Sequence, residues 1–224
     1  NDGGIGMLSD LGFSFLSENG SDAGEGGQAL GKVCSVDISG QDPRLKDCRF
    51  RVACDVTNPL CGKNGATYIY GPQKGVTEDM KEPLDQAMSH YARVCASFLG
   101  KDCSLAEGAG AAGGLGFAFL SFLNARLIPG TSLILEAVGL EEELKDADIV
   151  ITGEGRLDHQ TAMGKAPVGV ASLAKKYGAK VIAFAGSVTA DATACNDAGI
   201  DAFFPIVRGV TTLEEAMDPV NAKA

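Results

Sequence analysis

The stretch 149–158 constrains the fold more than any other, because an apolar, β-branched run ends there in charged residues. A continuous apolar run is typical of a buried parallel strand. In open α/β sheets, ligands bind just beyond the carboxyl ends of such strands. Glu154, Arg156 and Asp158 are therefore the first candidates for chemistry. The alternative is an ordinary strand-to-loop turn with solvated charges.

Two further apolar runs follow along the chain, at 180–185 and 202–206. A helix predicted over 167–176 precedes the first of them and begins at a proline, which suits a first helical turn. Strand, helix and strand at this spacing predict a right-handed βαβ unit with parallel strands. We therefore expect a Rossmann-like part from about residue 148 onward.

The part before residue 148 has a different pattern and predicts a separate, mixed α/β unit. Its strongest signal is an amphipathic helix over 77–100, in which apolar residues recur every three or four positions. Short strands are predicted at 12–16, 49–56 and 67–70. Other helices are predicted at 115–123, at 132–144 and after a capping box of Thr211 and Glu214.

Charge and cysteine usage disfavour several classes of partner. The net charge is −10 and the isoelectric point about 4.7, so a nucleic-acid backbone would be repelled. No apolar run approaches the roughly 20 residues of a membrane-spanning helix. Seven cysteines without a C-x-x-C spacing support neither a zinc site nor a disulfide framework. We expect a cytoplasmic protein with no nucleic-acid or membrane partner.

Two glycine-rich loops supply further candidate binding groups. Lys74 lies between glycines and could reach a phosphate as a point charge, unless it is a solvated lysine on a surface turn. Asp2, Gly3 and Gly4 precede a predicted short helix, and their N–H groups could hold an anion. A plain capped helix is the alternative there.

A third glycine loop, 108–114, contains the pattern G-x-G-x-x-G. The pattern is a dinucleotide-binding fingerprint only when a strand comes directly before it, and 101–107 is not strand-like. The loop enters an apolar segment predicted to be a buried helix, so it could form an anion or carbonyl site. The alternative is close backbone packing that only glycine permits.

Five sequence strings follow one another along nearly the whole chain. They are N-D-G-G-x-G-M-L at 1–8, A-C-D-x-x-N-P-L at 53–60, G-P-Q-K-G at 71–75, G-A-A-G-G-L-G at 110–116 and I-T-G-E-G-R-x-D-x-Q-T-x-x-G-K-A-P at 151–167. Together they closely resemble the bacterial class I glycerate kinase family.

The resemblance implies an α/β fold of two α/β domains. One is Rossmann-like with a parallel sheet, the other is an inserted mixed α/β domain, and the active-site cleft lies between them. Residues 1–147 would hold most of the inserted domain and 148–224 the later part of the Rossmann-like domain. Family members carry an N-terminal region and a C-terminal helix beyond this stretch, so we expect residues 1–224 alone to be inactive.

The implied activity is ATP- and Mg²⁺-dependent phosphorylation of D-glycerate to phosphoglycerate, with the 2- or 3-position left open. The implied catalytic residues are Asp158, as proton acceptor, Glu154 and Lys74, with Asp55 and Glu154 at the metal. Substrate- or nucleotide-binding residues would be Asp2, Gly3, Gly4, Asn58, Gln73, Gly113, Gly114, Arg156 and Lys165.

Two other classes of function stay open at this point. One is a nucleotide-dependent oxidoreductase that uses the Rossmann-like part. The other is a relative that binds a ligand without catalysis, against which the acids and Lys74 argue. The partner expected for a kinase is the small molecule D-glycerate, and a homodimer is the candidate assembly.

Overall fold

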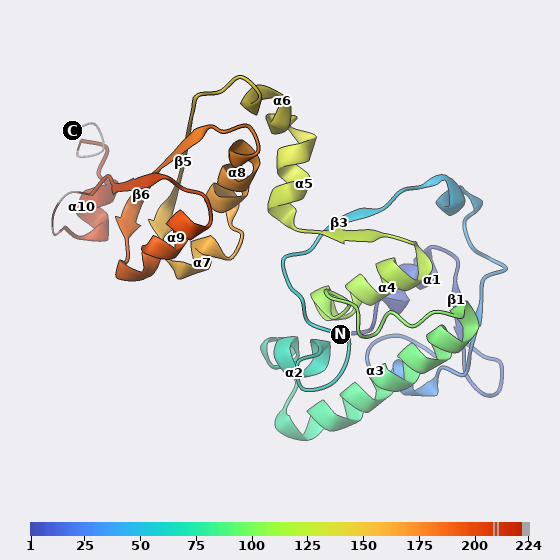
Figure 1. The fold of residues 1–224 in the computed structure, drawn as a ribbon. Helices are drawn as coiled ribbons and strands as arrows, with labels where there is room; N and C mark the ends of the chain where they lie inside the picture. The colour runs from blue at the N-terminus through green and yellow to red at the C-terminus, as the bar shows by residue number, and fades with distance from the viewer. Residues whose placement is uncertain (208, 210, 221–224) are drawn as a thin grey trace. The chain divides into compact units, whose positions relative to one another are not determined.

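The computed structural model describes residues 1–207, 209 and 211–220 (Figure 1). The chain divides into two compact units, Asn1–Gly130 and Thr131–Ala224, each with its own apolar core. The predicted α/β class is confirmed, because helices combine with parallel strands in both units. Among the described residues, no helix is long and apolar enough to cross a membrane.

The first unit surrounds one long helix with short helices and two small sheets. Its helices are α1 (Ile5–Asp10), α2 (Ala66–Tyr70), α3 (Glu78–Leu99) and α4 (Leu115–Phe122), with 3-10 segments at Ala29–Lys32, Pro43–Asp47, Pro72–Lys74 and Ala111–Gly113. Strands β1 (Ser14–Leu16) and β2 (Ser35–Asp37) pair antiparallel, and β3 (Arg51–Ala53) and β4 (Arg126–Ile128) pair in parallel.

Helix α3 carries the core of the first unit. The ring of Tyr91 contacts Phe15 and Phe117 at centroid distances of 5.6 and 5.7 Å, so it joins β1 to α4. The predicted helix over 77–100 is confirmed, and it ends at Gly100 in the left-handed conformation with φ of 66°. Its buried positions keep the predicted helical spacing: Met88, Tyr91, Ala92 and Cys95.

The segment 67–70 belongs to helix α2 and does not form the predicted strand. Aromatic and β-branched residues favour strands mainly through their packing context, so the preference is easily overridden. Here Ala66 and Thr67 are buried while Ile69 is exposed. The N–H of Ile69 donates to Gly65 O, which closes a helical turn. The strand prediction was wrong because this turn, not an alternating strand, fits the core.

The second unit is a three-stranded parallel sheet with helices between its strands. Strands β5 (Ile149–Leu157), β6 (Lys180–Val188) and β7 (Ala202–Pro205) are hydrogen-bonded in that order. The helices are α5 (Gly130–Ala137), α6 (Leu140–Leu144), α7 (His159–Ala162), α8 (Ala166–Lys175), α9 (Ala194–Asp197) and α10 (Leu213–Met217), with a 3-10 segment at Ala190–Thr193. The predicted βαβ unit is confirmed.

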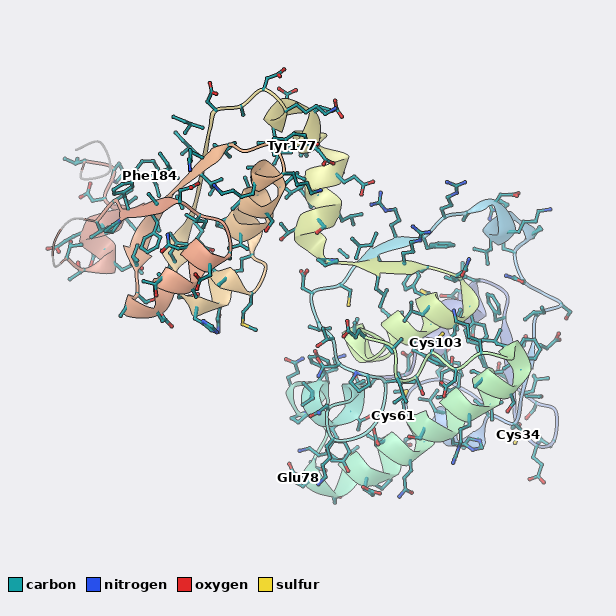
Figure 2. The ribbon with its side chains drawn as sticks, in the orientation of Figure 1. Cys34, Cys61, Glu78, Cys103, Tyr177 and Phe184 are labelled. Carbon is teal, nitrogen blue, oxygen red and sulfur yellow. The ribbon has the colours of Figure 1, made fainter. Side chains whose placement is uncertain are left out.

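The two faces of this sheet differ in burial. Val181 and Ala183 of β6 are fully buried in one core with residues of α8. The opposite face exposes Ile151, Phe184 and Phe204 by 67%, 43% and 50%, and Figure 2 labels Phe184 there. The sequence predicted buried strands, and the prediction fails for this face because the helices of the described residues cover only the other one.

Two predicted boundaries differ from the structure. The sequence analysis predicts one domain at 1–147 and another at 148–224, whereas the boundary between the two compact units of the structure falls after Gly130. The reason is that Leu144 is buried in the core of the second unit. Gly139, with φ of 69°, also divides the helix predicted over 132–144 into α5 and α6.

The capping box of α10 lies one residue later than predicted. Thr211 and Glu214 fit the S/T-x-x-E pattern, but so do Thr212 and Glu215. In the structure the Thr212 hydroxyl accepts a hydrogen bond from the N–H of Glu215, and the Glu215 side chain accepts one from the N–H of Thr212. Thr212 has the extended backbone that an N-cap needs, so it is the residue that begins the helix.

Candidate active site

The second unit gathers four charged side chains and one threonine at the carboxyl end of β5, in what we call the acid–base cluster: Glu154, Arg156, Asp158, Thr161 and Lys165. The strand continues through Glu154 and Arg156, so both project from β5, and Asp158 follows its last residue. A Cβ atom at Gly153 would lie 2.4 Å from Phe184 O, so only glycine lets β5 and β6 approach beside Glu154.

Asp158 is the N-cap residue of α7 and the centre of this cluster. Its Oδ1 accepts a hydrogen bond of 3.1 Å from the N–H of Thr161, and Lys165 Nζ lies 3.7 Å from the same oxygen. Arg156 Nε lies 3.9 Å from Oδ2. Desolvation alone would raise the pKa of Asp158, but the Thr161 N–H and the Lys165 charge outweigh it, so the pKa is lowered. Asp158 is therefore ionised at neutral pH.

Thr161 joins the two acids of the cluster, and the sequence analysis did not select it. Its side chain is fully buried, and its hydroxyl donates a hydrogen bond to Glu154 Oε1. The same hydroxyl accepts a bond of 3.3 Å from the N–H of Asp158, which completes a capping box. The signal in the sequence was the D-x-x-T spacing at the start of a helix.

Asp191 is a further acid that the sequence analysis missed. A hydrogen bond from the Thr189 hydroxyl lowers the pKa of Asp191, while the negative charge of Asp158 opposes this shift. Asp191 therefore lies within electrostatic reach of the acid–base cluster. Asp191 lies in the 3-10 segment just beyond the end of β6. This position could have predicted it from the sequence, because parallel strands end at one edge of the sheet.

The first unit has its own group of candidate residues, which we call the N-terminal loop cluster: Asn1, Asp2, Gly3, Gly4, Lys74, Gly113 and Gly114. Lys74 Nζ donates a hydrogen bond of 2.8 Å to Asn1 Oδ1, and Asn1 Nδ2 donates one of 2.8 Å to Ala66 O. A Cβ atom at Gly113 would lie 2.5 Å from Asn1 Oδ1. The glycine loop therefore packs directly against the side chain that holds Lys74.

Two N–H groups of the loop 2–4, those of Gly3 and Gly4, already have acceptors within the unit. The N–H of Gly3 donates to Gly113 O at 3.1 Å, and the N–H of Gly4 donates to Asp2 Oδ1 at 3.0 Å. Asp2 Oδ2 accepts a further bond of 3.3 Å from the N–H of Gly6 in the first turn of α1, but the N-cap residue of this helix is Gly4 and not Asp2. An anion that binds to the N–H groups of Gly3 and Gly4 would have to displace these bonds.

Three other predicted residues lie in the first unit, Asp55 and Asn58 in loops and Gln73 in the 3-10 segment Pro72–Lys74. Asn58 accepts a hydrogen bond of 2.6 Å from the Tyr70 hydroxyl and donates one of 2.8 Å to Asn64 O. Asp55 Oδ1 accepts a bond of 2.7 Å from the N–H of Gly130. Gln73 is exposed beside Lys74. Asn58 thus has partners at both ends of its amide, which is an arrangement typical of a loop brace.

The described part of the chain contains no group of three or more His, Cys, Asp or Glu side chains that could hold a metal ion. Asp55 and Glu154 belong to different units and are not part of such a group. Mg²⁺ needs only one or two protein carboxylates, because water and phosphate oxygens complete its shell. A carboxylate fixed by one hydrogen bond, as Glu154 is by Thr161, fits that requirement.

Fold and site together define an α/β protein whose acids and cations gather at the carboxyl edge of a parallel sheet, an arrangement typical of ligand-binding α/β proteins. The loop 108–114 has no strand directly before it, since 101–107 forms turns and irregular structure. The dinucleotide fingerprint therefore lacks the context that it requires.

The chain belongs to the glycerate kinase family, whose sequence model matches residues 1–223. It is 51% identical over 218 residues to "Glycerate kinase" of Bacillus subtilis and 51% identical over 216 residues to "Glycerate 2-kinase" of Escherichia coli. These matches cover 97% and 96% of this chain but 57% of each relative. The predicted family is confirmed.

A solved structure agrees with this assignment. The crystal structure of putative glycerate kinase 2 from Salmonella typhimurium matches with a TM-score of 0.82 and 48% identity, over 96% of this chain and 56% of that one. The fold described above is therefore that of a glycerate kinase relative over almost the whole chain.

Proposed function

We propose that the protein transfers the γ-phosphoryl group of ATP to D-glycerate, giving ADP and phosphoglycerate. Family membership and the names of relatives at 51% identity support this activity. The structural observation that carries it is Asp158, a carboxylate kept ionised near Lys165 and Arg156 and linked through Thr161 to Glu154. One relative is named as a 2-kinase, which favours the 2-hydroxyl as the acceptor.

In the proposed reaction, the glycerate hydroxyl oxygen attacks the γ-phosphorus while the bond to the β–γ bridging oxygen breaks. Asp158 accepts the proton of that hydroxyl. A low pKa at Asp158 is compatible with this role, because a loose phosphoryl-transfer transition state demands little of a strong base. Lys165 and Arg156 then stabilise the negative charge that accumulates on the phosphoryl oxygens.

The other residues would bind and orient the reactants. Lys74, fixed by Asn1, would contact a phosphate or the glycerate carboxylate as a point charge. Glu154 would hold Mg²⁺, and Asp55 is a separate candidate carboxylate of the first unit for a metal ion. Bound Mg²⁺ would neutralise charge on the transferring phosphates. Arg156 is 65% exposed on its side chain and can bind a carboxylate or phosphate through two parallel hydrogen bonds.

A coupled assay of the whole natural protein tests this function. With ATP, Mg²⁺ and D-glycerate we expect ADP release that depends on glycerate and stops when a chelator removes the metal. Phosphorus NMR of the product distinguishes 2- from 3-phosphoglycerate. Absence of glycerate-dependent ADP release would refute the kinase. Calorimetry that shows glycerate binding without ATP binding would support the non-catalytic relative.

We also propose that the protein works in the cytoplasm. All seven cysteines are free thiols, and Cys34 and Cys48 are exposed, which suits a reducing compartment. Fractionation of cells that express the tagged protein tests this location, and recovery outside the cytoplasmic fraction would contradict it.

A further inference from the structure

Thr161 is a buried threonine whose hydroxyl lies between two acids of the acid–base cluster. It is 0% exposed and is the third residue of α7. Only Thr161 and Thr67 appear among the buried polar residues of the described chain. A buried hydroxyl is costly unless it is hydrogen-bonded, so the partners of Thr161 matter.

The direction of these hydrogen bonds follows from the single proton of a hydroxyl. Thr161 Oγ1 accepts the N–H of Asp158 at 3.3 Å, which is all that a capping box requires. Asp158 Oδ1 lies 3.4 Å from Oγ1, beyond the usual O–H···O range of about 2.5–3.0 Å. The proton therefore goes to Glu154 Oε1. Helix capping does not explain this last bond.

The hydrogen bond from Thr161 to Glu154 connects two acids, Glu154 and Asp158, that belong to different elements. Glu154 projects from β5 on a long, flexible side chain, and Asp158 begins α7. Thr161 and Asp158 are joined by two hydrogen bonds, each from the backbone N–H of one residue to the side chain of the other, and the Thr161 hydroxyl donates to Glu154. One buried residue thus fixes the first carboxylate relative to the second.

We propose that Thr161 is a positioning residue, whose hydroxyl holds the Glu154 carboxylate in register with Asp158 for phosphoryl transfer. The role rests on the proposed kinase function. A displacement of about 1 Å at a reacting group can cost roughly 100-fold in rate, so loss of this hydrogen bond acts on the chemical step more than on substrate binding.

Two substitutions separate the hydroxyl from the shape of the side chain. Thr161→Val keeps the branched shape and removes the hydroxyl, whereas Thr161→Ser keeps the hydroxyl. In the full natural protein we expect Thr161→Val to lower kcat by roughly 10- to 100-fold with KM for D-glycerate changed by less than about threefold. Thr161→Ser should restore most of the lost rate.

Thr212 provides a matched control for helix capping. Its hydroxyl caps α10 in the same kind of box but is not part of the acid–base cluster. Thr212→Val should lower the melting temperature by a few degrees, as the loss of a cap does, and leave kcat unchanged. A kcat loss in Thr161→Val that Thr161→Ser also shows, or that Thr212→Val matches, would overturn the positioning role.

A double-mutant cycle with Glu154→Ala, which removes the acceptor of the Thr161 hydroxyl, tests whether Thr161 acts through Glu154. If it does, adding Thr161→Val to Glu154→Ala changes kcat by less than about twofold, and the melting-temperature shifts of the two changes are not additive. Additive effects on both quantities would refute the proposal.

The ADP-release assay and the melting-temperature cycle also separate the positioning role of Thr161 from the proposed kinase function. If the unaltered protein releases no ADP with glycerate, the kinase function has failed, and the positioning role in that reaction fails with it. The melting-temperature cycle then still decides whether the hydroxyl links the two side chains. If the unaltered protein is active and Thr161→Val keeps its kcat, the positioning role has failed while the kinase function stands.

Discussion

The ammonium group of Lys74 donates a 2.8 Å hydrogen bond to the side-chain oxygen of Asn1, so residues far apart in the sequence share one interaction. The amide nitrogen of Asn1 donates to Ala66 O, which fixes the orientation of the amide. Lys74 is exposed, and this bond is what gives its flexible side chain a preferred position. The orientation of the lysine is therefore a property of the folded first unit and not of the loop 71–75.

Removal of the Lys74 charge should impair the proposed kinase. In Lys74→Met we expect kcat/KM to fall by at least about tenfold, because a cation that contacts a phosphate or carboxylate is lost. Asn1→Ala keeps the Lys74 charge but removes the hydrogen bond that orients it, so the fall in kcat/KM should be smaller than for Lys74→Met. Lys63→Met, at an exposed lysine of the same unit, is the control and should behave like the unaltered protein. Equal activity of Lys74→Met and Lys63→Met would contradict a role for Lys74.

An alanine at Gly113 should destabilise the first unit. Gly113 has φ of +76°, and a Cβ atom there would lie 2.5 Å from Asn1 Oδ1. Gly20 has φ of +79° but nothing within 4 Å of such an atom. The loss of unfolding free energy in Gly20→Ala thus reports backbone strain alone, about 1–3 kcal/mol. The loss in Gly113→Ala should be larger, because the contact with Asn1 adds to the strain. Thermal unfolding checks this, and equal shifts for the two variants would show that the contact with Asn1 is unimportant.

Asp158→Asn should abolish most of the activity without unfolding the protein. Loss of the proton acceptor predicts a fall in kcat of roughly 10²- to 10⁴-fold. Asparagine caps helices about as well as aspartate, so α7 should keep its start. Asp146→Asn, at an exposed acid before β5, serves as the matched charge control. Near-normal kcat in Asp158→Asn would remove Asp158 from the catalytic residues.

Asp201 should make the stability of the second unit depend on acid pH. A hydrogen bond from Lys175, with others from the Val181 N–H and Lys180, lowers the pKa of Asp201 well below its usual value. Ionised Asp201 therefore stabilises the fold at pH values above the unfolded-state pKa of about 3.9. This stabilisation is lost progressively as the pH falls from there through the lower pKa of the folded state.

The melting temperature of Asp201→Asn should therefore lie below that of the unaltered protein near neutral pH, and the gap should narrow below about pH 4. Asp197→Asn, at an exposed acid on α9, is the matched control for the loss of one carboxylate. A gap that stays constant from neutral to acid pH would disprove the predicted linkage.

The cysteines should react with a thiol reagent in two groups. Burial raises the pKa of the Cys61 thiol to about 11 and that of Cys95 to about 12, so few thiolates form there. Cys34 and Cys48 are exposed and should react first at about pH 8. Labelling followed by peptide mass spectrometry identifies the sites, with Cys34→Ser losing one fast equivalent. Fast labelling of Cys95 in the folded protein would contradict the described core.

Elements with a long and regular pattern could be predicted from the sequence. The apolar spacing of α3 and the strand–helix–strand order around α8 identified both elements, because many residues repeat the same signal. The segment 67–70 could not be predicted, since four residues carry no period that separates a helical turn from a strand. Burial of Thr67 against the core decided its conformation.

The candidate site could be predicted only where its members are close in sequence. Glu154, Arg156 and Asp158 alternate along one strand end, so their grouping follows from the spacing. The bond between Asn1 and Lys74 depends on how the whole first unit folds, and no local pattern contains it. The role of Thr161 was hidden for a related reason, because its partner Glu154 lies on another element.

The pairing of the loop 2–4 with the loop 110–114 also has a consequence for synthesis on the ribosome. The N–H of Gly3 bonds to Gly113 O, so the loop 2–4 finds this partner only after more than a hundred further residues have emerged. At ~5–20 residues per second, that delay is roughly 5–20 seconds. During that time α1 has no packed neighbour from α4, so the shared core of the first unit is completed only after α4 has emerged.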